Sequence, residues 1–313
     1  MRNSSTFEPR SPSFESNHGV GPIFLLGSPR SGTTLLRLLL SAHPDIVIAP
    51  ESSFLTWFAP TYGDWTEADC DTERSATFVD DLMAARKFVT WGIDAASVRG
   101  AIQSRRPQSY VELASIPYEL YCDKVGKPNA RWGDKNNIHM DFVPQINEMF
   151  PDCVFLHIVR DVRDCFTSGE DIRKLASDSP YKPNLAADAT EFATGWDTQN
   201  QHTLADLASI DSNRWASIRY EDLVVDARAT LAPVLESWGM AWDDAMLAFH
   251  EENRAKQLEP VETSDWKKLV SQPITASQVG RFREQLREDD IAALESAALT
   301  TLTQFRYLDS KDS

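Results

Sequence analysis

A segment near the start of the chain has the form of a phosphate-binding loop. Residues 23–40 read IFLLGSPRSGTTLLRLLL, in which an apolar run leads through a glycine-containing turn into leucines at helical spacing. Gly27 and Gly32 allow a tight backbone path, and the amides of such a turn converge on an anion together with the positive end of the helix dipole. The spacing matches the pattern GxxxxGK followed by Ser or Thr, with Thr34 in the last place, except that Thr33 replaces the lysine.

The missing lysine bears on the class of ligand. In ATPases and kinases that lysine clamps the β- and γ-phosphates, whereas here Arg30 can supply a guanidinium from within the loop. The sequence therefore predicts that Arg30, Ser31, Gly32, Thr33 and Thr34 bind a phosphate that does not belong to a triphosphate. A small-molecule kinase that has lost its lysine is an alternative, and it would require ATP and Mg²⁺.

A second anion site is predicted at residues 160–168, RDVRDCFTS, which follow an apolar run rich in β-branched residues. Arg160 would emerge at the carboxyl end of a strand, where parallel sheets bind their ligands. If a helix begins at the next residue, Ser168 lies two turns along it and can join Arg160 around one phosphate, while Arg163 and Asp164 face elsewhere. A surface pair of arginine and aspartate at a helix start is the alternative.

A parallel sheet would bring these segments together. After the strand that begins at Ile23, further strands are predicted at residues 46–48, 131–134, 153–159 and 215–220. Helices are predicted at residues 76–91, 94–105, 109–124, 137–150, 188–208, 227–239 and 289–301, and from residue 161 onward. Strands that alternate with helices imply an α/β fold of P-loop-like, three-layer type, with a mostly parallel sheet flanked by helices. The helices between residues 76 and 124 look like a helical insertion.

The length and composition of the chain indicate how many domains it forms and which classes of partner it can bind. The chain has 313 residues, and because α/β folds of this length often form one compact unit, we expect a single domain over residues 21–308. Residues 1–20 are polar and rich in serine, which predicts a disordered tail rather than a signal peptide. No run has the length of a membrane span, so a cytoplasmic protein is expected. The net charge of −16 argues against nucleic acid and anionic membranes as partners.

The four cysteines contain no CxxC pair and predict reduced, structural thiols. An aromatic series follows Glu51 along the chain, and it consists of Phe54, Trp57, Phe58, Tyr62 and Trp65. These side chains could line a pocket for an aromatic or lipid-like alcohol, whereas packing in the core of a helix explains the first three equally well.

Taken together, the motifs resemble those of sulfotransferases that use 3′-phosphoadenosine 5′-phosphosulfate (PAPS), especially the branch of tyrosylprotein sulfotransferases and many bacterial enzymes. The segments that carry the resemblance are PRSGTTLL (29–36), HPDIVIAPES (43–52), GDKNN (133–137), RDVRDCFTS (160–168), RYEDLV (219–224) and QVGRFREQL (278–286). Their order and spacing extend from Ile23 to about Leu286, which makes the combination specific.

The resemblance implies roles for individual residues. The loop from Arg30 to Thr34 would hold the 5′-phosphosulfate, and Arg160 with Ser168 would hold the 3′-phosphate. Glu51 corresponds to the glutamate base of the tyrosylprotein branch, and Lys135 to the lysine that contacts the transferring group.

The C-terminal part of the resemblance concerns the nucleotide. Gly280 and Arg281 correspond to a cofactor-binding loop, with Arg283 as an alternative phosphate contact. Tyr220 follows the last strand and would stack on the nucleotide or hydrogen bond with it, unless it is a core residue.

The activity implied by the resemblance is transfer of a sulfuryl group from PAPS to an acceptor hydroxyl. Glu51 would accept the hydroxyl proton during an in-line attack, and Lys135 would neutralise developing charge. The scheme requires no metal. Carbohydrate, phenol, peptide tyrosine, lipid and natural-product hydroxyls all fit as acceptors, and the acidic composition favours a small intracellular one. A non-catalytic protein that binds the desulfated nucleotide is the alternative from another class.

Overall fold

The computed structural model describes residues 21–308, so the tail expected at residues 1–20 lies outside the described part of the chain. Its centre is a five-stranded sheet in the order β2-β3-β1-β4-β5, and every strand pair is parallel. The strands are β1 (Ile23–Leu26), β2 (Ile46–Ala49), β3 (Arg131–Lys135), β4 (Val154–Val159) and β5 (Trp215–Arg219). The predicted parallel sheet is thereby confirmed.

The strands form because their apolar side chains are buried on both faces of the sheet. β1 and β4 are buried at every position, which is typical of central strands in a parallel sheet. Successive residues of a strand point to opposite faces, so Ile23 and Leu25 pack into one hydrophobic core, whereas Phe24 and Leu26 pack into the other. The sheet therefore separates two helical layers.

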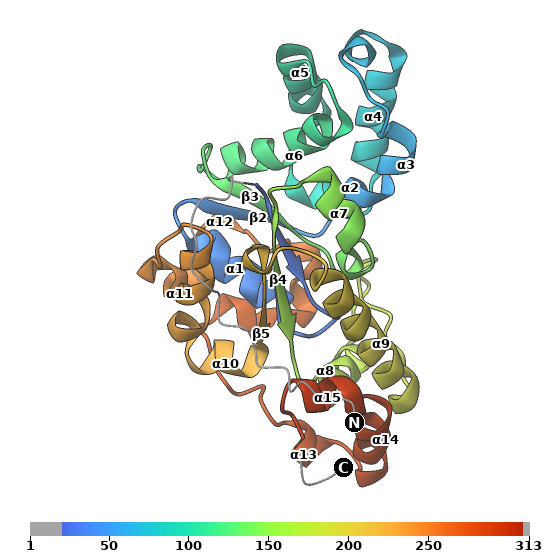
Figure 1. Ribbon diagram of the computed structural model, residues 1–313, viewed down its shortest axis with the longest axis vertical. Helices are drawn as coiled ribbons and strands as arrows, with labels where there is room; N and C mark the ends of the chain where they lie inside the picture. Colours follow the sequence, from blue (N-terminus) through green and yellow to red (C-terminus); the bar gives the residue numbers. More distant parts are fainter. Residues whose placement is uncertain (1–20, 309–313) are drawn as a thin grey trace.

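The two layers contain helices from distant parts of the sequence. Figure 1 shows α10, α11 and α12 on one side of the sheet, and α7 and α9 on the other. The first layer is made of α1 (Thr33–Ala42), α10 (Tyr220–Val225), α11 (Ala227–Ser237), η5 (Asp244–Ala248) and α12 (Phe249–Lys256). The second contains α6 (Tyr110–Lys124), α7 (Val143–Met149) and the end of α9 (Ala189–Leu207), and η4 (Ser212–Arg214) precedes β5. This is the three-layer α/β fold that the sequence predicts.

The upper end of the molecule in Figure 1 contains the predicted helical insertion and the short elements that precede it. The elements before α6 are α2 (Phe54–Trp57), α3 (Ala59–Tyr62), η1 (Glu67–Asp71), α4 (Glu73–Ala84), η2 (Phe88–Trp91) and α5 (Ala95–Arg105). The prediction of one continuous helix over residues 76–91 is wrong. Ala85 is extended and Lys87 has a left-handed backbone (φ 68°), because the chain turns here to bury Phe88 and Trp91 completely.

A second predicted helix, over residues 137–150, is also divided. The structure has a 3-10 turn, η3 (Asn137–Asp141), followed by α7, with Phe142 between them. Pro144 lies at the start of α7, where a residue without a backbone N–H is tolerated but cannot continue the preceding turn.

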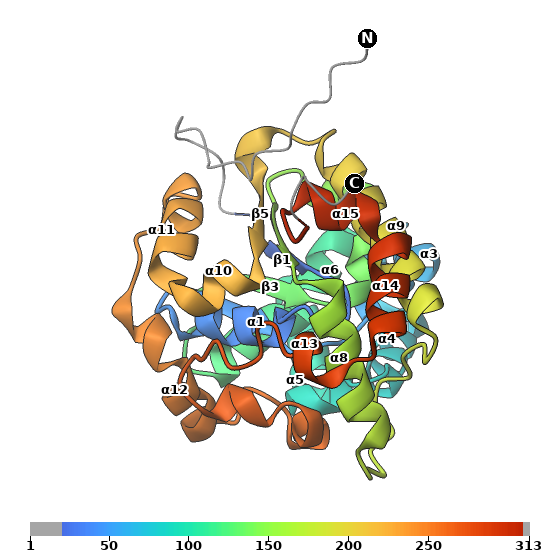
Figure 2. The ribbon, with the colours of Figure 1, turned by 90° about the horizontal axis from the view of Figure 1, so that it is seen from below.

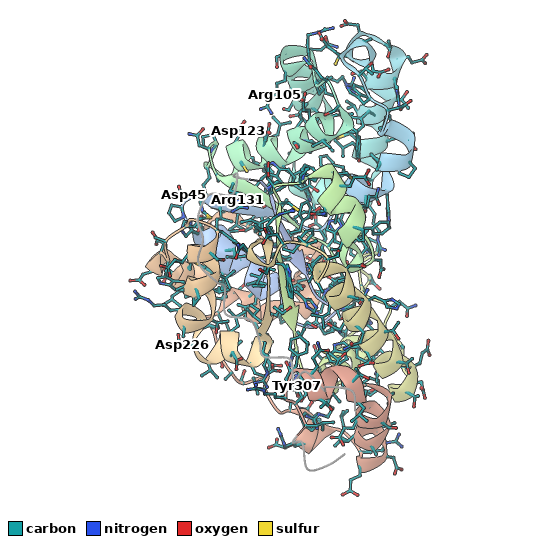
Figure 3. The ribbon with its side chains drawn as sticks, in the orientation of Figure 1. Asp45, Arg105, Asp123, Arg131, Asp226 and Tyr307 are labelled. Carbon is teal, nitrogen blue, oxygen red and sulfur yellow. The ribbon has the colours of Figure 1, made fainter. Side chains whose placement is uncertain are left out.

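The lower end of the molecule in Figure 1 is made of α8 (Val162–Lys174), α13 (Phe282–Gln285), α14 (Glu288–Ala297) and α15 (Leu299–Gln304). Two 3-10 turns, η6 (Val261–Trp266) and η7 (Lys268–Ser271), follow α12 in the chain, and η7 packs against α12 and α1. Figure 2 shows α13 and α14 beside α8. Tyr307, labelled in Figure 3, donates its hydroxyl proton to Glu221 at 2.6 Å, and the hydroxyl oxygen also lies 3.2 Å from the carbonyl oxygen of Val159. The end of the described chain is thus attached to the carboxyl ends of the central strands.

All four cysteines are buried and free, as predicted for structural thiols. Among the described helices, none combines the length and apolar character that a membrane crossing requires.

Candidate functional site

The predicted site residues lie along one edge of the sheet because most of them follow directly on a strand. Parallel strands end at a common edge, which is where ligands bind in such folds. Glu51 follows β2, Lys135 ends β3, Arg160 follows β4 and Tyr220 follows β5. The loop that contains Arg30 follows the central strand β1, so it separates the Glu51–Lys135 side of the edge from the Arg160–Tyr220 side.

The loop between β1 and α1 has no space for larger residues at its glycines. A Cβ atom on Gly27 would lie 2.9 Å from the carbonyl oxygen of Ile158, and one on Gly32 would lie 2.4 Å from the ring of Tyr220. Gly32 also has a φ of 94°, which L-residues rarely adopt. The helix begins at Thr33, and the first amides of a helix have no intrahelical partner. The amides of Thr33 and its neighbours therefore suit an anion.

Ser31 differs from the other loop residues. Its side chain is fully buried, with Oγ 3.8 Å from Sγ of Cys165, and its amide donates to the carbonyl of Ser28 at 3.1 Å. Ser31 therefore holds the shape of the loop, whereas Gly32, Thr33 and Thr34 line the cavity.

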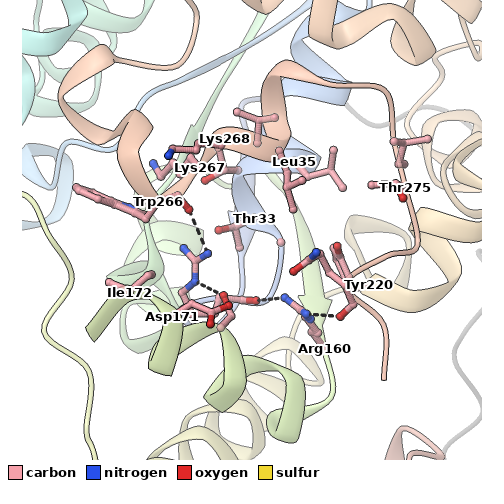
Figure 4. A pocket seen from close by; sticks show the side chains of 18 of the residues that line it. Thr33, Leu35, Arg160, Asp171, Ile172, Tyr220, Trp266, Lys267, Lys268 and Thr275 are labelled. Atoms are coloured by element: carbon pink, nitrogen blue, oxygen red, sulfur yellow. Dashed lines mark hydrogen bonds between the residues drawn. The ribbon is translucent and has the colours of Figure 1, made fainter. Parts of the chain in front are cut away.

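Arg30 contacts both members of the predicted second anion site, Arg160 and Ser168, although the sequence assigns Arg30 to the first site. Arg30 Nε donates to Ser168 Oγ at 3.0 Å, and Arg160 Nη1 donates to the carbonyl of Arg30 at 3.1 Å (Figure 4). Burial, followed by the charge of Arg160, lowers the pKa of Arg30 to about 10. Arg160 Nε is buried without a hydrogen-bond partner among residues 21–308. Two desolvated guanidinium groups and a free donor form a site that an anion would complete.

Tyr220 packs against both halves of this anion site. The guanidinium of Arg160 lies 4.5 Å from the centre of its ring, and the ring covers Gly32. Tyr220 is mostly buried and lines the cavity, so it is both a core residue and part of the cavity wall.

The loop around Gly280 is attached to this site by buried polar contacts. The carboxylate of Asp164 accepts hydrogen bonds from the amides of Gly280 (2.6 Å) and Phe282 (3.1 Å), and burial raises its pKa. Arg160 Nη2 donates to the carbonyl of Gln278 at 2.6 Å. Asp164 thus faces away from the cavity, as predicted, and Gly280 acts through its backbone.

Arg281 and Arg283 are distinguished by their surroundings. Arg281 lines the cavity and donates to Gln278 (2.6 Å) and Asp171 (2.8 Å). The guanidinium of Arg283 instead stacks on the ring of Phe282 at 4.6 Å. Of the two predicted phosphate contacts, Arg281 has the better position.

On the other side of the loop, Glu51 lies between two lysines. Lys135 Nζ donates to one carboxylate oxygen of Glu51 and Lys87 Nζ donates to the other. Lys135 also lies 3.5 Å from Thr34 Oγ1, which connects the pair with the phosphate loop. Although burial opposes it, the ammonium groups of Lys135, Lys267 and Lys87 hold the pKa of Glu51 well below its usual range. Burial lowers the pKa of Lys135 to about 8 despite the attraction of Glu51.

A buried polar cluster fixes the backbone around this pair. Asp134 is inaccessible to solvent, and its carboxylate is hydrogen bonded to Tyr118 (2.6 Å), His139 (2.8 Å) and Asn136 (2.7 Å). Asn136 Nδ2 also donates to the carbonyl of Ser52 at 3.1 Å. The cluster therefore connects the residue before Lys135 with the residue after Glu51.

A cavity of about 300 Å³ runs along the Arg30 side of the edge. Figure 4 shows Arg160 and Tyr220 towards one end and Trp266, Lys267 and Lys268 towards the other. Its apolar wall consists of Leu35, Phe249, Leu269, Val270, Pro273 and Ile274. An apolar wall with anion sites at both ends suits a nucleotide that carries phosphate groups at two positions. Residues 21–308 contain no group of three or more His, Cys, Asp or Glu side chains that could hold a metal ion.

The aromatic series after Glu51 is mostly core. Phe54, Tyr62 and Trp65 are almost completely buried, and the Tyr62 hydroxyl donates to Asp81 at 2.6 Å. Phe58 is partly buried against the same core, and Trp57 alone of the five is largely exposed, at 52%. The core alternative is therefore correct for Phe54 and wrong for Trp57. Tyr62 and Trp65, for which the sequence predicts only a pocket, are core residues as well.

Sequence reasoning did not find Lys87 or Lys267. Lys87 lies inside a run that has helical periodicity, and only the break in that run turns its side chain towards Glu51. Lys267 lies in a segment without a recognised motif. The basic pair of Lys267 and Lys268 beside Trp266 was the available signal.

Comparison with known proteins agrees with this geometry. A sequence profile described as "Sulfotransferase family" matches residues 22–244. Protein-tyrosine sulfotransferase A of Caenorhabditis elegans is 22% identical over 88% of this chain, and the match spans 64% of that relative's length.

Solved structures show the same fold. A sulfotransferase domain from the curacin biosynthetic pathway superposes with a TM-score of 0.63 at 18% identity, over 93% of this chain and 99% of that one. A mouse sulfotransferase complexed with PAP superposes with a TM-score of 0.50 at 14% identity, over 94% of this chain and 86% of that one. The profile covers more than two thirds of the chain, and with the strand-edge site this shows that the protein belongs to the sulfotransferase family.

Proposed function

We propose that this protein transfers a sulfuryl group from PAPS to the hydroxyl of an acceptor. The observation that carries the proposal is the division of the strand edge by the β1–α1 loop. Two guanidinium groups and a serine lie on one side of it, and the carboxylate–ammonium pair of Glu51 and Lys135 lies on the other. Family membership and the similarity to protein-tyrosine sulfotransferases support the same activity.

The residues fit both phosphate groups of the donor. Arg160, with its unpartnered Nε, and Ser168 would bind the 3′-phosphate. Arg30 and the amides at the start of α1 would bind the 5′-phosphosulfate. Bound PAPS supplies the sulfuryl group, and the chemistry at the acceptor falls to Glu51 and Lys135.

Lys135 would contact Glu51 in the free protein and the sulfuryl group when the donor is bound. In the free protein its ammonium is bonded to Glu51, which keeps that carboxylate ionised and a weak base. If Lys135 turns to the sulfuryl group when donor binds, Glu51 loses part of the charge that lowers its pKa. One oxygen of Glu51 would then be available to accept the acceptor's proton.

For the acceptor, we propose only a chemical class. A small hydroxyl compound such as a phenol, a saccharide or another alcohol would enter beside Glu51 and Lys87. We also propose that the protein acts in the cytoplasm, where its four free thiols would stay reduced.

Calorimetric titration tests the proposal directly. The protein and an Arg160→Ala variant would be titrated with adenosine 3′,5′-bisphosphate (PAP) and with ATP plus Mg²⁺. We expect PAP to bind the protein tightly and the variant at least about tenfold more weakly, because a charge-assisted contact is lost. Binding of ATP with no binding of PAP would instead indicate a divergent kinase.

A further inference from the structure

Lys267 reaches the catalytic side of the site from a distant part of the sequence. It lines the cavity together with Thr34, and the carbonyl of the preceding residue, Trp266, accepts a hydrogen bond from Arg30 Nη2 at 3.5 Å. Its charge lowers the pKa of both Glu51 and Lys135. Thr34, on the wall of the same cavity, lies 3.5 Å from Lys135 Nζ and so connects the part of the cavity at Lys267 with the Glu51–Lys135 pair.

Buried contacts fix the position of Lys267. Its Nζ donates to Glu259 Oε1, while Glu259 Oε2 accepts from Arg37 Nη2 at 2.7 Å. Arg37 lies on α1 and is inaccessible to solvent, and it also donates to the carbonyls of Ile48 (3.2 Å) and Leu258 (2.9 Å). Lys267 is therefore anchored to the helix whose first turn faces the phosphate loop.

Positively charged side chains outnumber carboxylates in the network of ion pairs around Lys267 and Glu51. Within the described part of the chain, four cations, Arg37, Lys87, Lys135 and Lys267, form ion pairs with two carboxylates, Glu51 and Glu259. Desolvated positive charge in excess costs free energy unless an anion enters. The end of the cavity near Lys267 lies opposite Arg160 in Figure 4, so this anion is distinct from the one at Arg160.

We propose that Lys267 is a second ammonium group, beside Lys135, that contacts the sulfuryl group of the donor, an inference that rests on the proposed function. In the reaction, the bond between sulfur and the bridging oxygen breaks as the acceptor oxygen bonds to sulfur. The acceptor proton passes to Glu51, and PAP leaves with the electron pair of the broken bond. Lys135 and Lys267 neutralise the charge on the sulfuryl oxygens and the bridging oxygen.

PAP and PAPS together test this role because they differ only in the sulfuryl group. For Lys267→Ala we expect affinity for PAPS to fall about tenfold or more and kcat about 100-fold, the scale of one lost charge-stabilising donor. Affinity for PAP should change by less than about twofold. Lys267→Gln retains a donor for Glu259 and controls for unfolding, and Lys267→Arg should recover part of the lost affinity for PAPS. Lys174→Ala, which removes an exposed lysine paired with Glu170, is the matched control.

The outcomes separate this inference from the proposed function. Equal losses for PAP and PAPS in both Lys267 variants would assign the residue to nucleotide binding or packing and overturn the inference. Unchanged affinity for PAPS and unchanged kcat would overturn it as well. Failure of the unaltered protein to bind either nucleotide would overturn the proposed function itself.

Discussion

Lys135 donates a hydrogen bond to the carboxylate of Glu51, so the proposed catalytic cation and the proposed base are each other's partner before any ligand binds. Lys87 occupies the second oxygen of the same carboxylate. Neither group is therefore prepared for its role in the free protein. Donor binding, by drawing Lys135 away, would prepare both at once.

Replacement of Glu51 by Gln should reduce kcat by about 10²- to 10⁴-fold, the usual contribution of a positioned base, with little effect on affinity for PAP. Steady-state kinetics with PAPS and calorimetry with PAP would measure the two effects. A near-normal kcat would exclude Glu51 as the base.

The Glu51→Gln variant should also differ from the unaltered protein in how its stability depends on pH. Since folding lowers the pKa of Glu51 below its ordinary value of 4.5, the carboxylate stabilises the fold above that pH. The stabilisation is lost as pH falls from 4.5 towards the pKa in the folded protein. Thermal unfolding between pH 7 and pH 3 should therefore show a difference between the protein and Glu51→Gln that is full at neutral pH and declines in acid. A difference independent of pH would contradict the ionic pairing.

Loss of the proton from the Lys135 ammonium should lower the rate at alkaline pH. Its pKa of about 8 in the free protein implies that kcat/KM for PAPS falls above this pH, as the ammonium loses its proton. Lys135→Arg, which stays charged, should abolish this limb even if its rate is lower. A profile of kcat/KM between pH 6.5 and 9.5 would show whether the two proteins differ.

Asn136 should affect catalysis indirectly, by holding Glu51 and Lys135 in place. Asn136→Ala removes the hydrogen bonds to Asp134 and Ser52 and leaves buried acceptors unpaired, which costs about 1–3 kcal/mol of unfolding free energy. Because Glu51 and Lys135 lose their common support, kcat should fall while affinity for PAP is retained. Chemical denaturation and kinetics on the same samples would separate the two effects, and unchanged kcat in a folded variant would dismiss the positioning role.

Trp57 and Tyr62 should respond differently to truncation. Trp57→Ala should raise the acceptor KM without altering the PAPS KM or the melting temperature, because the side chain is largely exposed. Tyr62→Ala removes a buried ring and a hydrogen bond to Asp81 and should cost about 3–5 kcal/mol of stability, the range for truncated core aromatics. An acceptor KM that Trp57→Ala leaves unchanged would remove that residue from the acceptor site.

The strand-edge residues could be predicted from the sequence because buried parallel strands are continuous apolar runs. Val154–Val159 and the arginine after it illustrate this, since the strand alone determines where Arg160 emerges. Lys87 could not be found in this way, because Phe78, Val79, Leu82, Phe88 and Trp91 keep an apolar pattern across the break at Ala85. Periodicity reports which residues are buried, but it does not show where the backbone changes direction.

The contacts of the buried Arg37 guanidinium also limit where the chain can be cut to make a fragment. The family profile ends at residue 244, yet Arg37 donates hydrogen bonds to Leu258 and Glu259, beyond that limit. A fragment cut at the profile boundary would leave an arginine side chain in the core without those acceptors. It would also lack the wall of the cavity from Phe249 to Arg281. The family profile and the packed fold are therefore different lengths of chain, and exchanges between relatives should keep the chain through Tyr307 rather than join it at residue 244.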